Sequence, residues 1–502
     1  MTGESTSFRL IPANQKNRQP TPNGSTGNKR TKLIVVAHGF ADAGVNKEGV
    51  AQFFEDSNWS GAAQAQTFET DSPAKNGFFN LNPRTRFAHA KQDFRERRRA
   101  GISGLLTPLV GYLAIGLTEQ DSDISAIDVV SPSFTRDKKW LPENATLLTG
   151  GTEGRGFELL GSVLDWLEEK QNKETGQFEA PDEIIIAGHS LGAPTVSSFF
   201  EALATASVDD PRIGEERRES LKAARTMFLD EHNSSQVNVQ LIDPGIDPQH
   251  SLLLPQRIKD NDDGSSRRKK TIIFPLLRAV GGGVVEQTSQ IMQSDMSVSR
   301  KISRLLFRLP QLANVIRYSL RLPAVLHEAG PVVSSSSLHG FAEMTRLVDK
   351  SNSGRNTTKN RSSVNVIFHE KDQIFPAESM ERQLKDSGGV YSIQKSLPEE
   401  RGLHQAKHAV KYVRDVWSNT KEAGTTVDRK RTRARQVAKL ALRAAIDFRL
   451  DAKMPQPYTS HHGGSEYFVN IIPDGSHTSV GLKDDAKRVS ESILSAHTKS
   501  TA

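Results

Sequence analysis

Short apolar runs recur along the chain and alternate with stretches in which apolar residues follow helical spacing. The runs are rich in Ile and Val and hold five to seven residues each, which is typical of strands buried on both faces. They predict strands at 32–37, 124–130, 182–187, 237–242, 364–368 and 391–395. Apolar residues three or four positions apart predict helices at 154–169 and 193–206, and further helices are expected near 378–385 and at 406–418.

This alternation predicts an α/β fold with a doubly wound, mostly parallel sheet covered by helices. The pattern is interrupted between about 252 and 361, where Pro310 and Pro323 break helix-like pieces, so an inserted helical cap is expected. A basic helix at 429–448 and a final strand–loop–helix unit follow the second part of the core. The predicted parts are a flexible N-terminal arm at 1–30, a first core part at 31–249, a helical cap or lid at 250–360, a second core part at 361–418 and a basic C-terminal extension at 419–502.

The composition excludes several kinds of catalytic and metal chemistry. The chain has 502 residues and no cysteine, which excludes disulfides, thiolate metal sites and a cysteine nucleophile. The net charge is +7, and the segment from 250 to 330 alone holds thirteen Lys and Arg against six Asp and Glu. The excess is therefore concentrated in the predicted cap, where an anionic membrane surface is the expected partner. Nucleic acid is a weaker alternative because aromatic residues make up 6% and are not interleaved with the basic clusters.

An uncharged apolar segment at 101–118 follows the basic run at 95–99. Its length is at the lower limit for crossing a bilayer, and its four glycines and Pro108 disfavour a helix. A buried or lid-like insert is favoured, and a membrane-inserting hairpin or span is the alternative. The first ten residues show no secretory signal, so the expected location is cytoplasmic or peripheral to a membrane, with non-classical export left open.

The sequence Gly188-His189-Ser190-Leu191-Gly192 matches GxSxG between a predicted strand and a predicted helix. A serine on such a tight turn projects above the sheet edge, and glycines remove side chains that would clash there. The helix that follows presents backbone N–H groups toward developing negative charge. This context predicts a nucleophilic serine.

With its neighbouring motifs, this turn resembles the α/β-hydrolases, particularly the lipase and esterase branch. The matching segments are KLIVVAHGFADAG (32–44), IIIAGHSLGAP (184–194), VQLIDPG (239–245) and VNVIFHEKDQIFP (364–376). The resemblance implies a catalytic triad in the order Ser, acid, His, and an oxyanion hole made by two backbone amides. It assigns Ser190 as the nucleophile and the amides of Phe40 and Leu191 as the oxyanion donors. His38 is expected to brace the loop that carries Phe40.

Several residues compete for the other two triad positions. Asp372 is the favoured acid, with Glu370 and Asp243 as the other candidates. His404 is the favoured base because it lies 32 residues after Asp372, close to the family's habit. His477, between a strand and the final helix near the C-terminus, is the alternative.

The implied function is cleavage of carboxylic esters, with lipid esters favoured, through an acyl-enzyme and without a cofactor. An acyltransferase or thioesterase using the same triad is one alternative. A non-catalytic membrane- or partner-binding protein with this fold is another. No metal site is expected, since His461 and His462 are adjacent and lack an obvious third ligand.

Overall fold

The computed structural model divides the chain into two compact units, Met1–Val390 with Ser460–Ala502 and Tyr391–Thr459. Nearly all described residues belong to the first unit. The structure describes residues 7–12, 30–39, 42–56, 68–70, 103–121, 123–132, 134, 152–171, 178, 180–207, 213–230, 235–245, 298, 301–302, 305–306, 340–341, 343–344, 346–348, 362–369, 372, 374–375, 390–392, 459–462, 465–472, 475 and 477–500.

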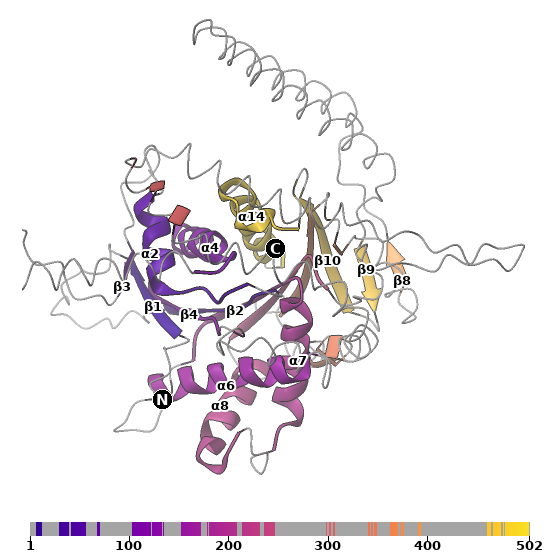
Figure 1. Cartoon of the computed structure of the whole chain (residues 1–502). Helices are drawn as coiled ribbons and strands as arrows, with labels where there is room; N and C mark the ends of the chain where they lie inside the picture. The colour runs from indigo at the N-terminus through magenta and orange to yellow at the C-terminus, as the bar shows by residue number, and fades with distance from the viewer. Residues whose placement is uncertain are drawn as a thin grey trace, which may run out of the picture. The chain divides into compact units, whose positions relative to one another are not determined.

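A mostly parallel sheet forms the centre of the first unit (Figure 1). Its strands follow the order β3-β1-β4-β2-β5-β6-β7-β10-β9. Six adjacent strands run parallel to one another, namely β4, β2, β5, β6, β7 and β10. The outer strands β1, β3 and β9 pair antiparallel. The strand bounds are β1 Ser7–Pro12, β2 Arg30–Ala37, β3 Phe68–Thr70, β4 Ile124–Val130, β5 Glu183–His189, β6 Gln236–Ile242, β7 Ser363–His369, β9 Thr459–His462 and β10 Ser465–Ile472, with β8 Val390–Ser392 at the boundary of the units.

Helices cover both faces of this sheet, as the doubly wound prediction requires. In Figure 1, α2 (Lys47–Asp56), α4 (Thr107–Gln120) and α14 (Lys483–Ser500) lie on one face. The other face carries α6 (Glu153–Lys170), α7 (Gly192–Thr205) and α8 (Arg218–Leu229). The short 3-10 helices are η1 (Glu215–Arg217) and η4 (Ser479–Gly481). The predicted strands β2, β4, β5, β6 and β7 and the helices α6 and α7 are therefore confirmed.

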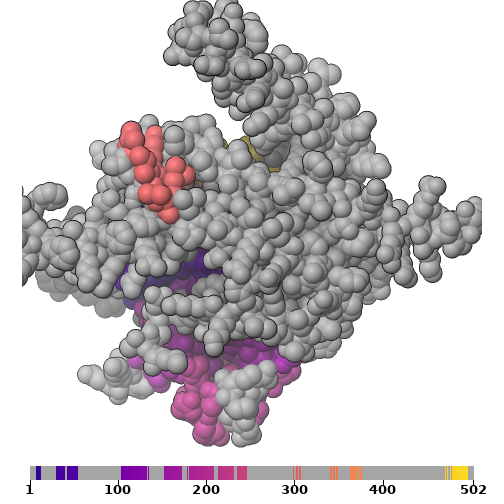
Figure 2. Space-filling view, viewed as in Figure 1, coloured from indigo at the N-terminus to yellow at the C-terminus, as the bar shows by residue number. Residues whose placement is uncertain are grey.

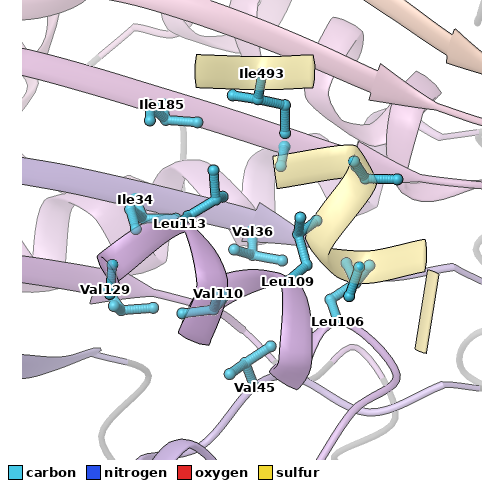
Figure 3. Close-up of a cluster of buried hydrophobic side chains, with 14 of the residues drawn as sticks. Ile34, Val36, Val45, Leu106, Leu109, Val110, Leu113, Val129, Ile185 and Ile493 are labelled. Carbon is cyan, nitrogen blue, oxygen red and sulfur yellow. The ribbon is translucent and has the colours of Figure 1, made fainter. Parts of the chain in front are cut away.

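The apolar segment at 101–118 supplies a core helix. In α4, Leu109, Val110 and Leu113 are fully buried, and Figure 3 shows them packed among side chains that include Ile34 of β2 and Ile493 of α14. A Cβ added at Gly111 would collide with the Phe53 side chain, and one added at Gly116 would collide with the Leu494 side chain. The glycines thus serve close helix packing, which corrects the membrane alternative for this segment. Among the described residues, no helix is long and apolar enough to cross a membrane.

The core also extends beyond its predicted boundaries at both ends. Residues 7–12, predicted to lie in an N-terminal arm, form β1 beside β4, and the Arg9 guanidinium bonds to the buried Asp128 carboxylate at 2.7 and 2.8 Å. Residues 465–472, predicted to lie in an extension, form β10 parallel to β7. The helices expected at 378–385, 406–418 and 429–448 lie outside the described residues.

Candidate active site

The serine of the GxSxG turn sits where β5 ends and α7 begins. Ser190 has a backbone φ of 58°, a left-handed conformation that a non-glycine residue adopts only under constraint from its surroundings. Its N–H donates to the carbonyl of Ile242 at 2.9 Å, and its own carbonyl accepts from the N–H of Gly245 at 3.0 Å. The end of β6 therefore fixes the turn in the conformation that presents the hydroxyl.

The loop after β2 passes directly against this serine. A Cβ added at Gly39 would lie 2.9 Å from Ser190 Cβ and 3.3 Å from Ser190 Oγ. His38 holds the loop: its Nδ1–H donates to the carbonyl of Gly39 at 2.8 Å, and its Nε2 accepts from the N–H of Phe134 at 3.1 Å. Burial, reinforced by the positive charge of Arg155, lowers the pKa of His38 to about 3, so the ring is a neutral brace.

A carboxylate and a histidine meet at the same end of the sheet. One oxygen of Asp372, just beyond β7, accepts from the N–H groups of Ile374 at 2.7 Å and Phe375 at 3.1 Å. Its other oxygen accepts from His477 Nδ1 at 2.8 Å. Both side chains are buried. Because Nδ1–H is donated to Asp372, Nε2 of His477 remains an acceptor.

Opposing effects act on the titration of His477. Burial lowers its pKa, but the charge and hydrogen bond of the adjacent Asp372 carboxylate, together with the charge of Asp243, outweigh burial and leave the pKa raised above the ordinary value of 6.5. The same pair stabilises an imidazolium once His477 receives a proton. A histidine held in this way can act as a general base.

The structure brings together some of the predicted site residues. Ser190 and Leu191 follow β5 and Asp372 follows β7, two parallel strands that flank β6, so all three residues lie at the carboxyl edge of the sheet. Leu191 immediately precedes the first turn of α7. The histidine bonded to Asp372 is the alternative, His477, and not the favoured His404. His404 and Phe40 lie outside the described residues.

Asp243 is hydrogen-bonded to His369 and not to His477. Its carboxylate accepts from His369 Nδ1 at 2.5 Å and from the His369 backbone N–H at 2.8 Å. Sequence reasoning missed His369, although it directly follows the strand predicted at 364–368 and lies three residues before Asp372. It also missed His189, inside the motif itself, whose Nε2–H donates to the carbonyl of His477 at 2.8 Å. Arg155, a buried cation that donates to the carbonyl of His38 at 2.7 Å, carried no local signal in its helix.

Three of these buried residues have possible metal-ligand atoms close together. Those of His189, Asp243 and His477 lie within 4.8 Å of one another. Each residue already has a hydrogen-bond partner, namely the His477 carbonyl, His369 and Asp372 respectively. A metal ion here would compete with the bonds of His189 and Asp243, but not with the bond from His477 Nδ1 to Asp372, which leaves Nε2 as an acceptor. The contacts that the described residues make here form a hydrogen-bonded network.

No protein-family model matches this sequence, and no curated protein matches it either. Among solved structures, the peroxisomal alpha-beta-hydrolase Lpx1 from Saccharomyces cerevisiae aligns over 94% of this chain and 77% of its own, with 9% identity and a TM-score of 0.30. A thermophilic esterase from Thermogutta terrifontis covers 94% and 91%, with 10% identity and a TM-score of 0.26. A thioesterase domain from the curacin biosynthetic pathway covers 93% and 92%, with 8% identity and a TM-score of 0.28.

These three neighbours are hydrolases by name. The fold of this chain is defined by its own sheet and turn. Six parallel strands lie between two layers of helices, and the serine follows β5 on a constrained turn into α7. The structure therefore has the α/β fold, with a mostly parallel sheet covered by helices, that the sequence predicted.

Proposed function

We propose that this protein is a serine hydrolase that cleaves carboxylic esters, with Ser190 as nucleophile, His477 as general base and Asp372 as the acid that orients the base. One observation carries the proposal. A buried histidine is hydrogen-bonded to a buried carboxylate at 2.8 Å, and its backbone is bonded to the residue that precedes the constrained serine. Nucleophile, base and orienting acid are the three parts that acyl transfer through a serine requires.

The reaction follows from these roles. Ser190 Oγ attacks the ester carbonyl carbon and passes its proton to Nε2 of His477, and the carbonyl oxygen becomes an oxyanion. The Leu191 N–H, at the start of α7, is the described candidate donor to that oxyanion. The imidazolium then protonates the leaving alkoxide. Water, deprotonated by the same histidine, hydrolyses the acyl-enzyme and restores Ser190.

Lipid esters are the proposed substrates, and an anionic membrane surface is the proposed partner. Support comes from the basic segment at 250–330 and from the largest apolar side chains exposed among the described residues. Val298, Ile302 and Leu306 are spaced four residues apart and are 72, 52 and 58% exposed. We call these three residues the 298–306 stripe, and Figure 2 shows this part of the chain at the surface. A peripheral location on a membrane fits such a stripe with its neighbouring basic residues.

A fluorophosphonate probe tests the function directly, because it labels only an activated serine. We expect mass spectrometry to find the label on Ser190 in the wild-type protein and to find none in Ser190→Ala. Ser197→Ala, a change of a buried serine within α7, should leave labelling intact. Absence of label in folded wild-type protein would refute the proposal.

Substrate class is a separate measurement. Long-chain esters presented in anionic vesicles should be hydrolysed with a higher kcat/KM than soluble butyryl esters. Faster turnover of the soluble esters would remove the lipid preference while leaving the serine mechanism intact.

A further inference from the structure

A second buried carboxylate–histidine pair lies beside Asp372 and His477. Asp243 follows β6 and His369 ends β7, and both side chains are fully buried. One oxygen of Asp243 accepts from the His369 ring and the other from the His369 backbone N–H. Asp243 also has a φ of 44°, which a non-glycine residue rarely adopts. The carboxylate is thus fixed by two bonds in a strained backbone, a combination that often marks functional sites.

His189 connects this pair to the proposed base. Its Nε2, which donates to the carbonyl of His477, lies 3.8 Å from Asp243 Oδ2. The centroids of the His189 and His477 rings are 4.9 Å apart. Burial and the nearby His477 lower the pKa of His189 to about 3, so this ring is a neutral link. The residue before the nucleophile therefore touches both the base and the second carboxylate.

His369 supports the same loop from another point. A Cβ added at Gly475, two residues before His477, would lie 3.0 Å from His369 Cγ and still closer to Cδ2. It would also lie 3.3 Å from Oδ2 of Asp485, at the start of α14. The loop that carries His477 therefore rests on the His369 ring and can approach it only because Gly475 has no side chain.

Charge in the second pair acts on the base. Burial favours neutral forms, yet Asp243 keeps the pKa of His369 raised and His369 keeps the pKa of Asp243 lowered. Asp485 and Asp372 add negative charge near His369. At His477, the Asp243 charge raises the pKa more than the His369 charge lowers it, while Asp372 has the larger effect. The net effect of the second pair is therefore that of a negative charge, which raises the pKa of His477.

We propose that Asp243 and His369 are positioning residues for the general base, holding the loop of His477 through His189 and Gly475 and placing a second carboxylate near the imidazolium. The inference rests on the proposed function of Ser190. When Ser190 Oγ forms its bond to the acyl carbon, its proton moves to Nε2 of His477, and the positive charge formed there faces Asp372 directly and Asp243 across a short distance. Neither Asp243 nor His369 exchanges a proton or touches substrate in this step.

Asp243→Asn tests the electrostatic part. The substitution removes the Asp243 carboxylate and, with it, the charge that raises the pKa of His369. Because Asp243 affects the pKa of His477 more than His369 does, the pKa of His477 should fall. We expect kcat to fall about tenfold to hundredfold with KM little changed, and the acidic limb of kcat/KM to move to lower pH. Asp128→Asn is the matched control: it removes a buried, ion-paired carboxylate on β4, three strands from β6. It should lower stability without moving the limb.

His369 offers a second test that does not depend on Asp243→Asn folding. His369→Asn keeps a donor near Nδ1, whereas His369→Leu removes it, so the first should retain several times more kcat than the second. Equal losses, or an unmoved acidic limb in Asp243→Asn with wild-type kcat, would overturn the inference. So would an inactive Asp243→Asn beside an active Asp372→Asn, which would make Asp243 the triad acid. Failure of wild-type Ser190 to label with fluorophosphonate would instead refute the proposed function, which keeps the two failures distinct.

Discussion

Gly192 allows the nucleophile turn to pack against the end of β2, and Gly192→Ala tests that packing. An added Cβ would lie 2.7 Å from the carbonyl carbon of Ala37, nearest to the oxygen of the same group, and 2.9 Å from the carbonyl oxygen of His38. All three atoms belong to backbone, so no side chain can rotate away. Since ordinary contact begins near 3.5 Å, the contact with the Ala37 carbonyl carbon alone requires the start of α7 and the end of β2 to separate by at least roughly 0.8 Å, and the nearer oxygen requires more.

Such a separation displaces the Leu191 amide and Ser190 from the loop that faces them. A misplacement of about 1 Å can cost on the order of 10²-fold in rate, so we expect kcat toward p-nitrophenyl butyrate to fall about tenfold to hundredfold. Gly161→Ala, inside α6, is the control: its Cβ would meet only Arg217 Nη1 at 3.6 Å. It should keep full activity and gain roughly 0.4–1 kcal/mol of stability. Wild-type kcat in a fully folded Gly192→Ala variant would refute the reasoning.

Three further measurements test other parts of the account. Leu113→Ala in α4 removes a fully buried side chain and should lower the free energy of unfolding in urea by about 2–5 kcal/mol. Glu119→Ala, at an exposed position of the same helix, should change it by less than about 0.5 kcal/mol. Equal effects would contradict a core position for α4. Because Asp372 raises the pKa of His477, kcat/KM for a soluble ester should decline as pH falls through a value above 6.5, and an acidic limb below 6.5 would contradict that pairing. Replacing the 298–306 stripe with serines should weaken cosedimentation with phosphatidylserine vesicles at least tenfold without changing hydrolysis of a soluble ester, and unchanged binding would argue against this surface.

Local sequence patterns were sufficient to predict the strands at the centre of the sheet. The strands β2, β4, β5, β6 and β7 are short segments rich in Ile and Val and are buried on both faces, so each can be recognised without knowledge of its partner. The nucleophile turn was equally visible, because its chemistry lies in five consecutive residues. Asp372 could be placed from its position just after β7.

The proposed base, His477, was harder to identify because the strand before it, β10, pairs with a partner distant in sequence. The strand β10 mixes Glu466, Tyr467 and Asn470 with apolar residues, and it joins the sheet through β7, about a hundred residues earlier. Residues 391–459 form a separate unit between them. The spacing from Asp372 in the sequence therefore favoured His404. In the fold, the pairing of β10 with β7 places the loop of His477 beside Asp372.

The helix α4 shows a different limit of sequence reasoning. Its glycines reduce helix propensity when the segment is considered alone. In the fold, Gly111 and Gly116 face Phe53 and Leu494, so the loss in propensity is offset by closer packing. Only the tertiary neighbours distinguish this role from that of a membrane insert.

A comparison of two histidine variants tests directly whether His477 activates Ser190. We expect His477→Ala to lower kcat/KM for p-nitrophenyl butyrate by at least about 10³-fold and to slow fluorophosphonate labelling of Ser190, with the fold intact by circular dichroism. His404→Ala should retain kcat/KM within about threefold of wild type. Loss of activity in His404→Ala with its retention in His477→Ala would contradict the account.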